Sequence, residues 1–230
     1  MKTVLITRTA SDNFINHIKI LNFNPIIFPT IETKPINFNA KINLHEFKII
    51  IFISPAAITH FSNQIKTLPA DLKIFTMGED SAGLVKSLGW NPPTYPLKNY
   101  SRNGLLDLPE LQNVSDISVL IIEAQNSNNI LAAELTSRGA HVTQLFAYEK
   151  VLPKPATYPN LENIDIIIAT SETGLNNLVT LLGPDVKHKT LLLSSERLVS
   201  VAKKAGFTQK PLLAQNASEN ALLQALKTVA

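Results

Sequence analysis

Four turns that follow predicted strands carry small and hydroxyl residues that could bind an anion. They read Ser54-Pro55-Ala56-Ala57, Met77-Gly78-Glu79-Asp80, Thr170-Ser171-Glu172-Thr173 and Ser194-Ser195-Glu196-Arg197. Ligands of parallel α/β sheets bind beyond the carboxyl ends of the strands, where helix dipoles and free backbone N–H groups favour carboxylates and phosphates. At each turn, capping of the helix alone is the competing interpretation. The candidate substrate-binding residues are Arg8, Ser54, Pro55, Ala56, Gly78, Ser101, Thr170, Ser171 and Ser195.

Tyr148 is the side chain best suited to proton transfer. It follows an expected strand over residues 142–146 and precedes a proline-rich break, so we expect it at the edge of a cleft. A phenol there can donate a proton, or hydrogen-bond a departing hydroxyl, without a cofactor. A tyrosine that only packs against the break is the alternative. Arg8, just past the first expected strand, is the basic residue best placed to meet an anionic ligand.

Other chemistries lack their usual sequence patterns. The chain has no phosphate-binding P-loop, no dinucleotide-binding glycine pattern and no nucleophile elbow, and its 8 glycines form no glycine-rich loop. The 5 histidines are scattered without the spacing of metal ligands, and cysteine is absent. We therefore expect no metal site and no cysteine nucleophile.

The composition is that of an ordinary globular protein. Lysine and arginine number 21 against 18 acidic residues, and a net charge of +3 is too small for a protein that binds nucleic acid by neutralising phosphates. No apolar run approaches the length of a membrane span, and no secretory signal peptide is expected. With no cysteines, this favours a cytoplasmic protein that contacts neither nucleic acid nor membrane.

The two halves of the chain repeat each other at an offset of 117 residues. The run Ile49-Ile50-Ile51 followed by Ser54 falls on Ile166-Ile167-Ile168 followed by Ser171. Further along, Glu79, Lys86 and Gly89 fall on Glu196, Lys203 and Gly206. Two copies of one α/β unit predict two similar lobes, with function in the cleft between them.

Each copy alternates strands with helices, which is typical of parallel sheets built from right-handed crossovers. We predict two flavodoxin-like lobes of about five strands each, joined by a two-stranded linker. The expected helices of the second copy begin near Asn128, Ser171, Ser195 and Ser218. The expected strands cover residues 3–7, 24–29, 49–53 and 73–76 in the first copy, and 119–122, 142–146, 164–169 and 190–193 in the second.

Proline-rich breaks fall at the same place in both copies, at Pro35 to Asn39 and at Pro153 to Pro159. Proline cannot continue a sheet ladder and stiffens a linker, so these breaks favour crossings between lobes near 33–39 and 150–159. One lobe would then comprise residues 1–35 plus 153–230, and the other residues 36–150. Two sequential lobes divided near Ser115 are the alternative.

The ordered set of segments resembles the uroporphyrinogen-III synthase family over the whole chain. The resemblance is carried by Val4-Leu5-Ile6-Thr7-Arg8, Ile51-Phe52-Ile53-Ser54-Pro55-Ala56-Ala57, Arg138-Gly139-Ala140-His141-Val142 leading to Tyr148-Glu149-Lys150, Ile168-Ala169-Thr170-Ser171, and Ser194-Ser195-Glu196-Arg197-Leu198. It implies a monomeric, cofactor-free lyase of tetrapyrrole and haem biosynthesis. Such an enzyme cyclises hydroxymethylbilane to uroporphyrinogen III, with inversion of ring D and loss of water.

The resemblance also implies which residues act. The tyrosine of the family's cleft matches Tyr148, and a substrate with eight carboxylates suits a cleft rimmed by helix N-termini. The expected partner is the small molecule hydroxymethylbilane, and a transient contact with the enzyme that produces it stays open. The runner-up interpretation is a non-catalytic two-lobed homologue that binds tetrapyrroles or regulates. A nucleotide-sugar transferase is disfavoured because the chain is short and has no pyrophosphate loop.

The chain departs from the family pattern at three places. Thr9 stands where the family often has proline. Met77-Gly78-Glu79-Asp80 replaces a Gly-Pro type of turn, and the stretch Glu123-Ala124-Gln125-Asn126-Ser127-Asn128-Asn129 replaces an Arg-Gly start with a later Gly-Arg. The last departure is the best support for the non-catalytic alternative.

Overall fold

The computed structural model describes residues 1–38 and 42–230 and divides them into two compact units. Unit 1 comprises Met1–Glu32 and Val151–Ala230, and unit 2 comprises Thr33–Lys150. The chain thus passes twice from one unit to the other, after Glu32 and after Lys150. The end of the expected first linker, at Asn39, lies outside the described residues.

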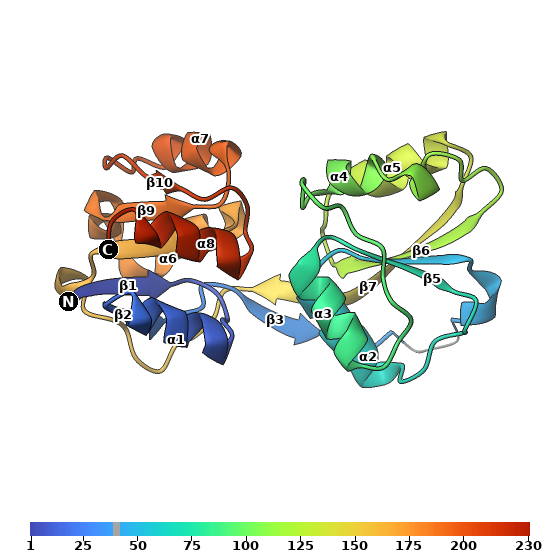
Figure 1. Ribbon diagram of the computed structural model, residues 1–230, viewed down its shortest axis with the longest axis horizontal. Coiled ribbons are helices and arrows are strands. Elements are labelled where there is room, and N and C mark those ends of the chain that lie inside the picture. The colour runs from blue at the N-terminus through green and yellow to red at the C-terminus, as the bar shows by residue number, and fades with distance from the viewer. Residues whose placement is uncertain (39–41) are drawn as a thin grey trace. The chain divides into compact units, whose positions relative to one another are not determined.

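Unit 1 is built on a five-stranded parallel sheet (Figure 1). Its strands, in chain order, are β1 (Lys2–Ile6), β2 (Phe23–Ile27), β8 (Ile166–Ala169), β9 (Thr190–Leu193) and β10 (Leu212–Leu213). Their spatial order is β10-β9-β8-β1-β2. This 2-1-3-4-5 order is the flavodoxin-like arrangement. The pairing of β1 with β8 brings the two ends of the chain into one sheet, which rules out a sequential division near Ser115.

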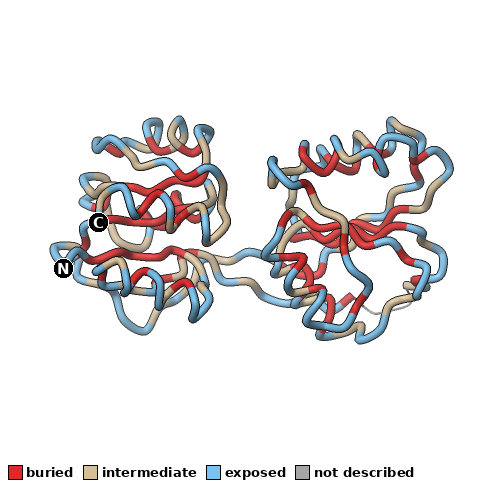
Figure 2. Tube along the Cα trace, in the orientation of Figure 1, coloured by how far each residue is buried: buried red, intermediate tan, exposed pale blue. Residues whose placement is uncertain are grey.

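Both faces of the unit 1 sheet are covered by helices, as the uninterrupted apolar runs of its strands require. One face packs against α6 (Glu172–Leu182) and α7 (Glu196–Lys204), and the other against α1 (Asp12–Ile20) and α8 (Glu219–Lys227). The strand residues alternate between these two cores. The strands of this sheet are accordingly coloured mostly as buried in Figure 2.

The sheet of unit 2 runs β3-β7-β6-β4-β5, formed by β3 (Glu32–Pro35), β7 (His141–Val151), β6 (Ser118–Ala124), β4 (Ile49–Phe52) and β5 (Lys73–Thr76). It repeats the first four strands of the 2-1-3-4-5 order as β7-β6-β4-β5, with β6 and β7 from the second copy and β4 and β5 from the first. About five strands were expected in each lobe, but after α3 (Glu79–Ser87) the chain forms only an isolated bridge between Phe75 and Thr94. Instead β3, which the pattern did not predict as a strand, lies beside β7 as the fifth.

The helices of unit 2 cover its sheet on both faces (Figure 1). One face carries α2 (Pro55–Gln64) and α3 (Glu79–Ser87), and the other carries α4 (Arg102–Leu106) and α5 (Ile130–Ser137). Short 3-10 turns complete the elements, at Leu44–Glu46 and Pro109–Leu111 in unit 2 and at Leu161–Asn163 and Pro184–His188 in unit 1.

The stretch Arg138-Gly139, part of the family resemblance, has a structural role. Gly139 has a φ of +89°, and a Cβ there would meet Ser115 at 3.0 Å, so the turn into β7 requires glycine. The Arg138 guanidinium donates to the carbonyl oxygens of Leu106 and Leu111 at 2.8 and 2.9 Å. These bonds tie the α5–β7 turn to the segment that follows α4.

Strand β7 is longer than the sequence predicted. The expected strand over residues 142–146 extends to Val151, because β3 supplies a second neighbour and the backbone N–H of Ile36 donates to the carbonyl of Ala147 at 3.0 Å. We expected Tyr148 just after the end of this strand, but it lies inside it.

An aromatic cluster under α2 anchors the core of unit 2. The ring of Phe61 lies 5.7 Å from Phe38, 5.5 Å from Phe52 and 6.2 Å from Trp90, centroid to centroid, and is fully buried. Replacing Phe61 with alanine should lower the free energy of unfolding of unit 2 by about 3–5 kcal/mol, through lost contacts and the cavity left behind.

Denaturant unfolding followed by the fluorescence of Trp90, the single tryptophan, measures this loss. Leu97 is 80% exposed, so Leu97→Ala is the matched control and should change stability by less than about 0.5 kcal/mol. A similar loss in both variants would show that the aromatic cluster does not hold the unit together.

Candidate active site

A β-bulge determines where Tyr148 lies. Glu123 on β6 pairs with Phe146 on β7, and the next residue, Ala124, pairs with Tyr148, so Ala147 is an extra residue in β7. Without the bulge, a regular strand would point Tyr148 to the face of α4 and α5, because side chains alternate along a strand. With it, Tyr148 joins the core on the face of α2, beside Ala124.

The hydroxyl of Tyr148 reaches the cap of helix α2. Its oxygen lies 2.8 Å from Ser54 Oγ, and the Ser54 oxygen also accepts the backbone N–H of Ala57 at 3.1 Å. Ser54 therefore does more than cap the helix, because its own hydroxyl proton can be donated to the phenol oxygen. The structure thus brings together two of the residues predicted from the sequence, Tyr148 and Ser54.

His60 packs against the ring of Tyr148. The two rings are stacked, with centroids 5.3 Å apart and planes inclined by 20°. His60 Nε2 lies 2.9 Å from the hydroxyl of Thr33, and its Nδ1 is buried with no hydrogen-bond partner in the described part of the chain. Burial lowers the pKa of His60, so the imidazole is neutral at physiological pH. Sequence analysis did not predict this contact.

The environment of Tyr148 keeps its phenol protonated. Burial raises the pKa of Tyr148 above the ordinary value of 10.0, since only 3% of the residue is exposed. The hydrogen bond from Ser54 opposes this shift, nearby Glu123 adds to it, and Arg102 opposes it. The phenol therefore carries its proton at neutral pH. The Ser54 hydroxyl can hydrogen-bond the phenolate that loss of this proton would create.

A charged cluster that sequence analysis did not predict lies at the end of β6. Glu123 is 2% exposed, and its Oε2 lies 3.4 Å from Nη2 of Arg102, the first residue of α4. The side-chain amide of Gln144 donates to Glu123 Oε1 at 2.6 Å. The only feature of the sequence that pointed to this cluster was Glu123, an acid at a position where the family usually has Arg-Gly.

The remaining candidates of unit 2 differ in exposure, from the buried Gly78 to the exposed Pro55. Gly78 is buried, and a Cβ there would meet the ring of Tyr100 at 3.0 Å, so this ring covers the start of α3. Ser101 caps α4 by accepting the N–H of Gly104 at 3.1 Å. Pro55 and Ala56 are the first two residues of α2, after the Ser54 cap.

In unit 1, the predicted hydroxyl residues act as helix caps. Ser171 accepts the N–H of Gly174 at 3.1 Å, and Ser195 accepts that of Leu198 at 3.4 Å. The carbonyl of Thr170 accepts from the Ser194 hydroxyl at 3.4 Å. Arg8 lies 3.8 Å from Glu219 in an ion pair and donates to the carbonyl of Ala217 at 3.1 Å. These contacts fix the positions of the residues. That the residues bind a ligand stays a prediction.

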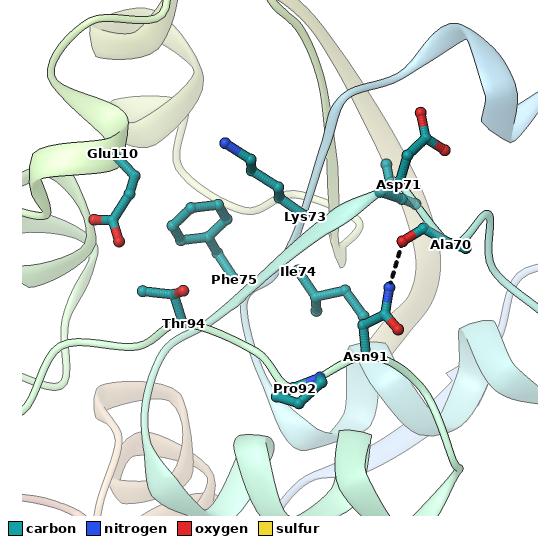
Figure 3. Close-up of a pocket in the computed structure, with 10 residues that line it drawn as sticks. Ala70, Asp71, Lys73, Ile74, Phe75, Asn91, Pro92, Thr94 and Glu110 are labelled. Carbon is teal, nitrogen blue, oxygen red and sulfur yellow. Dashed lines mark hydrogen bonds between the residues drawn. The ribbon is translucent and has the colours of Figure 1, made fainter.

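Two cavities in the described part of the chain lie away from all of these residues. One of about 360 Å³ opens beside the first residues of β5, where Asn91 donates to the carbonyl of Ala70 at 2.8 Å (Figure 3). A second, of about 300 Å³, is lined in unit 1 by Leu191 and Thr208, the repeat equivalents of Ile74 and Asn91. Since equivalent residues of the two copies line a cavity in each unit, these cavities are a packing feature of the repeated fold.

Within residues 1–38 and 42–230, no three His, Asp or Glu side chains gather closely enough to hold a metal ion. No helix in these ranges combines the length and apolar character that a membrane crossing needs.

The raised pKa of Tyr148 predicts how stability depends on pH. Below pH about 10 both folded and unfolded states keep the phenol protonated, and wild type should exceed Tyr148→Phe in unfolding free energy by about 0.5–1.5 kcal/mol through the Ser54 hydrogen bond. Above pH about 10 the unfolded chain ionises first, so this advantage should shrink as pH rises through the folded pKa.

Denaturant titrations between about pH 8 and pH 11 measure the difference. Tyr158, 57% exposed, provides the control Tyr158→Phe, whose difference from wild type should stay flat. A Tyr148 difference that is equally flat would contradict the burial of the phenol.

Comparison with known proteins places the chain in a family. Residues 12–224 match the family model described as HEM4, uroporphyrinogen-III synthase HemD. The chain is 26% identical over 246 aligned positions to the uroporphyrinogen-III synthases of Escherichia coli and Salmonella typhimurium, covering 98% of this chain and 100% of each relative.

Two solved structures show the same fold. The uroporphyrinogen-III synthetase of Helicobacter pylori aligns over 100% of both chains with a TM-score of 0.68 and 13% identity. A mutant uroporphyrinogen III synthase of the extremely thermophilic bacterium Thermus thermophilus aligns over 99% of this chain and 98% of its own, with a TM-score of 0.61 and 17% identity. From the family match over most of its length, this chain belongs to the uroporphyrinogen-III synthase family.

Proposed function

We propose that this protein is a uroporphyrinogen-III synthase, which cyclises hydroxymethylbilane to uroporphyrinogen III in tetrapyrrole and haem biosynthesis. The observation that carries the proposal is the buried, protonated Tyr148, held against Ser54 at 2.8 Å in a chain of this family. The reaction releases water and makes a carbon–carbon bond, which makes the protein a lyase.

Tyr148 would act on the hydroxymethyl group of the bilane. As the carbon–oxygen bond breaks, the phenol proton passes to the departing oxygen, which leaves as water. Ser54 then donates its hydroxyl proton in a hydrogen bond to the phenolate oxygen, which stabilises the charge left on Tyr148. The electron-deficient carbon so formed is attacked by the substituted carbon of ring D, which gives a spiro intermediate. The bond from this ring D carbon to its original bridge methylene then breaks, and the methylene bonds to the unsubstituted α-carbon of ring D. Loss of the proton on that α-carbon restores the aromatic pyrrole and balances the proton that Tyr148 gave up.

The rest of the site would fold the flexible bilane. Effective positioning of two reacting groups contributes as much as about 7–11 kcal/mol to an intramolecular step. The N-terminal turns of α2, α6 and α7 offer backbone N–H groups to the carboxylates, beyond those already taken by Ser54, Ser171 and Ser195. In unit 2, Pro55, Ala56, Gly78 and Ser101 are proposed to contact the substrate, and in unit 1, Arg8 and Thr170 are.

The proposal extends to the setting in which the enzyme works. We propose a cytoplasmic monomer that needs no cofactor, as the absence of cysteine and the phenol chemistry suggest. A second candidate function is a non-catalytic homologue that binds tetrapyrroles, and it is favoured by Glu123 where the family usually has Arg-Gly.

An isomer assay decides between these two functions. Purified protein supplied with freshly generated hydroxymethylbilane should yield the type III isomer of uroporphyrinogen, separated by chromatography after oxidation. Formation of only the spontaneous type I isomer, together with tight binding of the bilane, would favour the non-catalytic homologue.

Tyr148→Phe should lower the turnover number by roughly 10²–10⁴, the usual range for loss of a general acid. Tyr158→Phe is the matched control, because this tyrosine is exposed, with its ring 6.0 Å from that of Phe28. Equal turnover of wild type and Tyr148→Phe would remove Tyr148 from the mechanism.

A further inference from the structure

Arg102 is held in place but makes few hydrogen bonds. Of its five N–H donors, one contacts Glu123 at 3.4 Å, and this is its only hydrogen bond within the described residues. Its Nε is buried without a partner, while 23% of its side chain is exposed to solvent. The other N–H groups of Arg102 can therefore donate to an incoming acceptor. Both carboxylate oxygens of Glu123 already accept a hydrogen bond, one from Arg102 and the other from Gln144.

The repeat indicates that the direction of this ion pair matters. Arg102 and Glu219 occupy the same position in the two copies, each as the first residue of its helix. Glu219 pairs with Arg8, which follows β1, whereas Arg102 pairs with Glu123 in β6. Both units thus join a helix to the end of a strand by an ion pair, but with opposite polarity. An ion pair of either polarity would link the helix to the strand. This linkage alone therefore does not explain why unit 2 carries the cation on its helix.

The surroundings of Arg102 are positively charged. Lys150, two residues after Tyr148, has its pKa lowered, first by the protein around it and then by the charge of Arg102. Lys150 is exposed, so solvent screens this effect. No described carboxylate lies within ion-pair distance of Lys150. The cluster thus contains two cations, Arg102 and Lys150, and one buried acid, Glu123.

We propose that Arg102, oriented by the buried Glu123, binds one carboxylate of the substrate at the Tyr148 end of unit 2. A planar guanidinium binds a carboxylate through two parallel hydrogen bonds, which fixes the orientation of the group as well as its place. Glu123 and Gln144 are positioning residues, because they act on the substrate only through Arg102. This inference rests on the proposed function and names a specific contact for it.

Substitution of Arg102 tests the contact. Arg102→Gln should raise KM for hydroxymethylbilane about tenfold with kcat changed by less than about twofold, and should weaken binding of the octacarboxylate uroporphyrin III by a similar factor. Lys48, whose amine pairs with Asp71 at the other end of β4, provides the matched control. Lys48→Gln should leave KM and porphyrin affinity unchanged. An unchanged KM and porphyrin affinity in Arg102→Gln would overturn the proposal.

Exchange of the two charges separates recognition from structure. The double variant Arg102→Glu with Glu123→Arg keeps an ion pair, in the polarity seen at Glu219 and Arg8. It should unfold at a temperature close to that of wild type but bind uroporphyrin III at least as weakly as Arg102→Gln. Wild-type affinity in the exchanged variant would show that the pair is only structural.

Two further results keep the inference distinct from the proposed function. If wild type produces the type III isomer while Arg102→Gln keeps the wild-type KM, the contact is wrong and the function stands. If wild type produces only the type I isomer but Arg102→Gln weakens porphyrin binding about tenfold, the contact stands and the synthase function is wrong.

Discussion

The site in unit 2 depends on the β-bulge at Ala147 in strand β7. The bulge at this residue shifts the alternation of side chains, so Tyr148 turns to the face of α2 and meets Ser54. The same shift buries the phenol, which raises the pKa of Tyr148, while the hydrogen bond from Ser54 limits the rise. Burial, protonation and the hydrogen-bond partner of Tyr148 therefore follow from a single backbone irregularity, of the kind that often re-aims a side chain near active sites.

The duplication supplies two similar frames, and differences between the copies give one of them its chemistry. Ser54 and Ser171 cap equivalent helices, but Tyr148 reaches Ser54, whereas its repeat equivalent Ile31 has no polar group to offer Ser171. The ion pairs at the ends of α4 and α8 are likewise equivalent in place and opposite in polarity. The buried acid, the phenol and the stacked imidazole of His60 are features of unit 2.

Much of the fold could be predicted from the sequence because its signals are local or repeated. The buried strands, the serine caps of α2, α6, α7 and α8 and the two α/β units follow from apolar runs, capping chemistry and the repeat, and the flavodoxin-like class is confirmed. The length of β7 was predicted wrongly, and β3 was missed, because pairing between distant segments leaves no local pattern. The contact between Ser54 and Tyr148 depends on the bulge, and Arg102 contacts Glu123 only because the folded sheet brings their elements together. Neither contact could be predicted from the sequence.

The measurement that tests this account most directly is the titration of Tyr148 itself, by NMR of protein carrying tyrosine labelled with carbon-13 at Cζ. The signal absent from Tyr148→Phe identifies the residue. We predict that this signal keeps its protonated shift through pH about 10, ionises only above it, and ionises at still higher pH in Ser54→Ala, where the supporting hydrogen bond is lost. Ionisation of Tyr148 at or below the pH of the exposed Tyr158 would contradict the account.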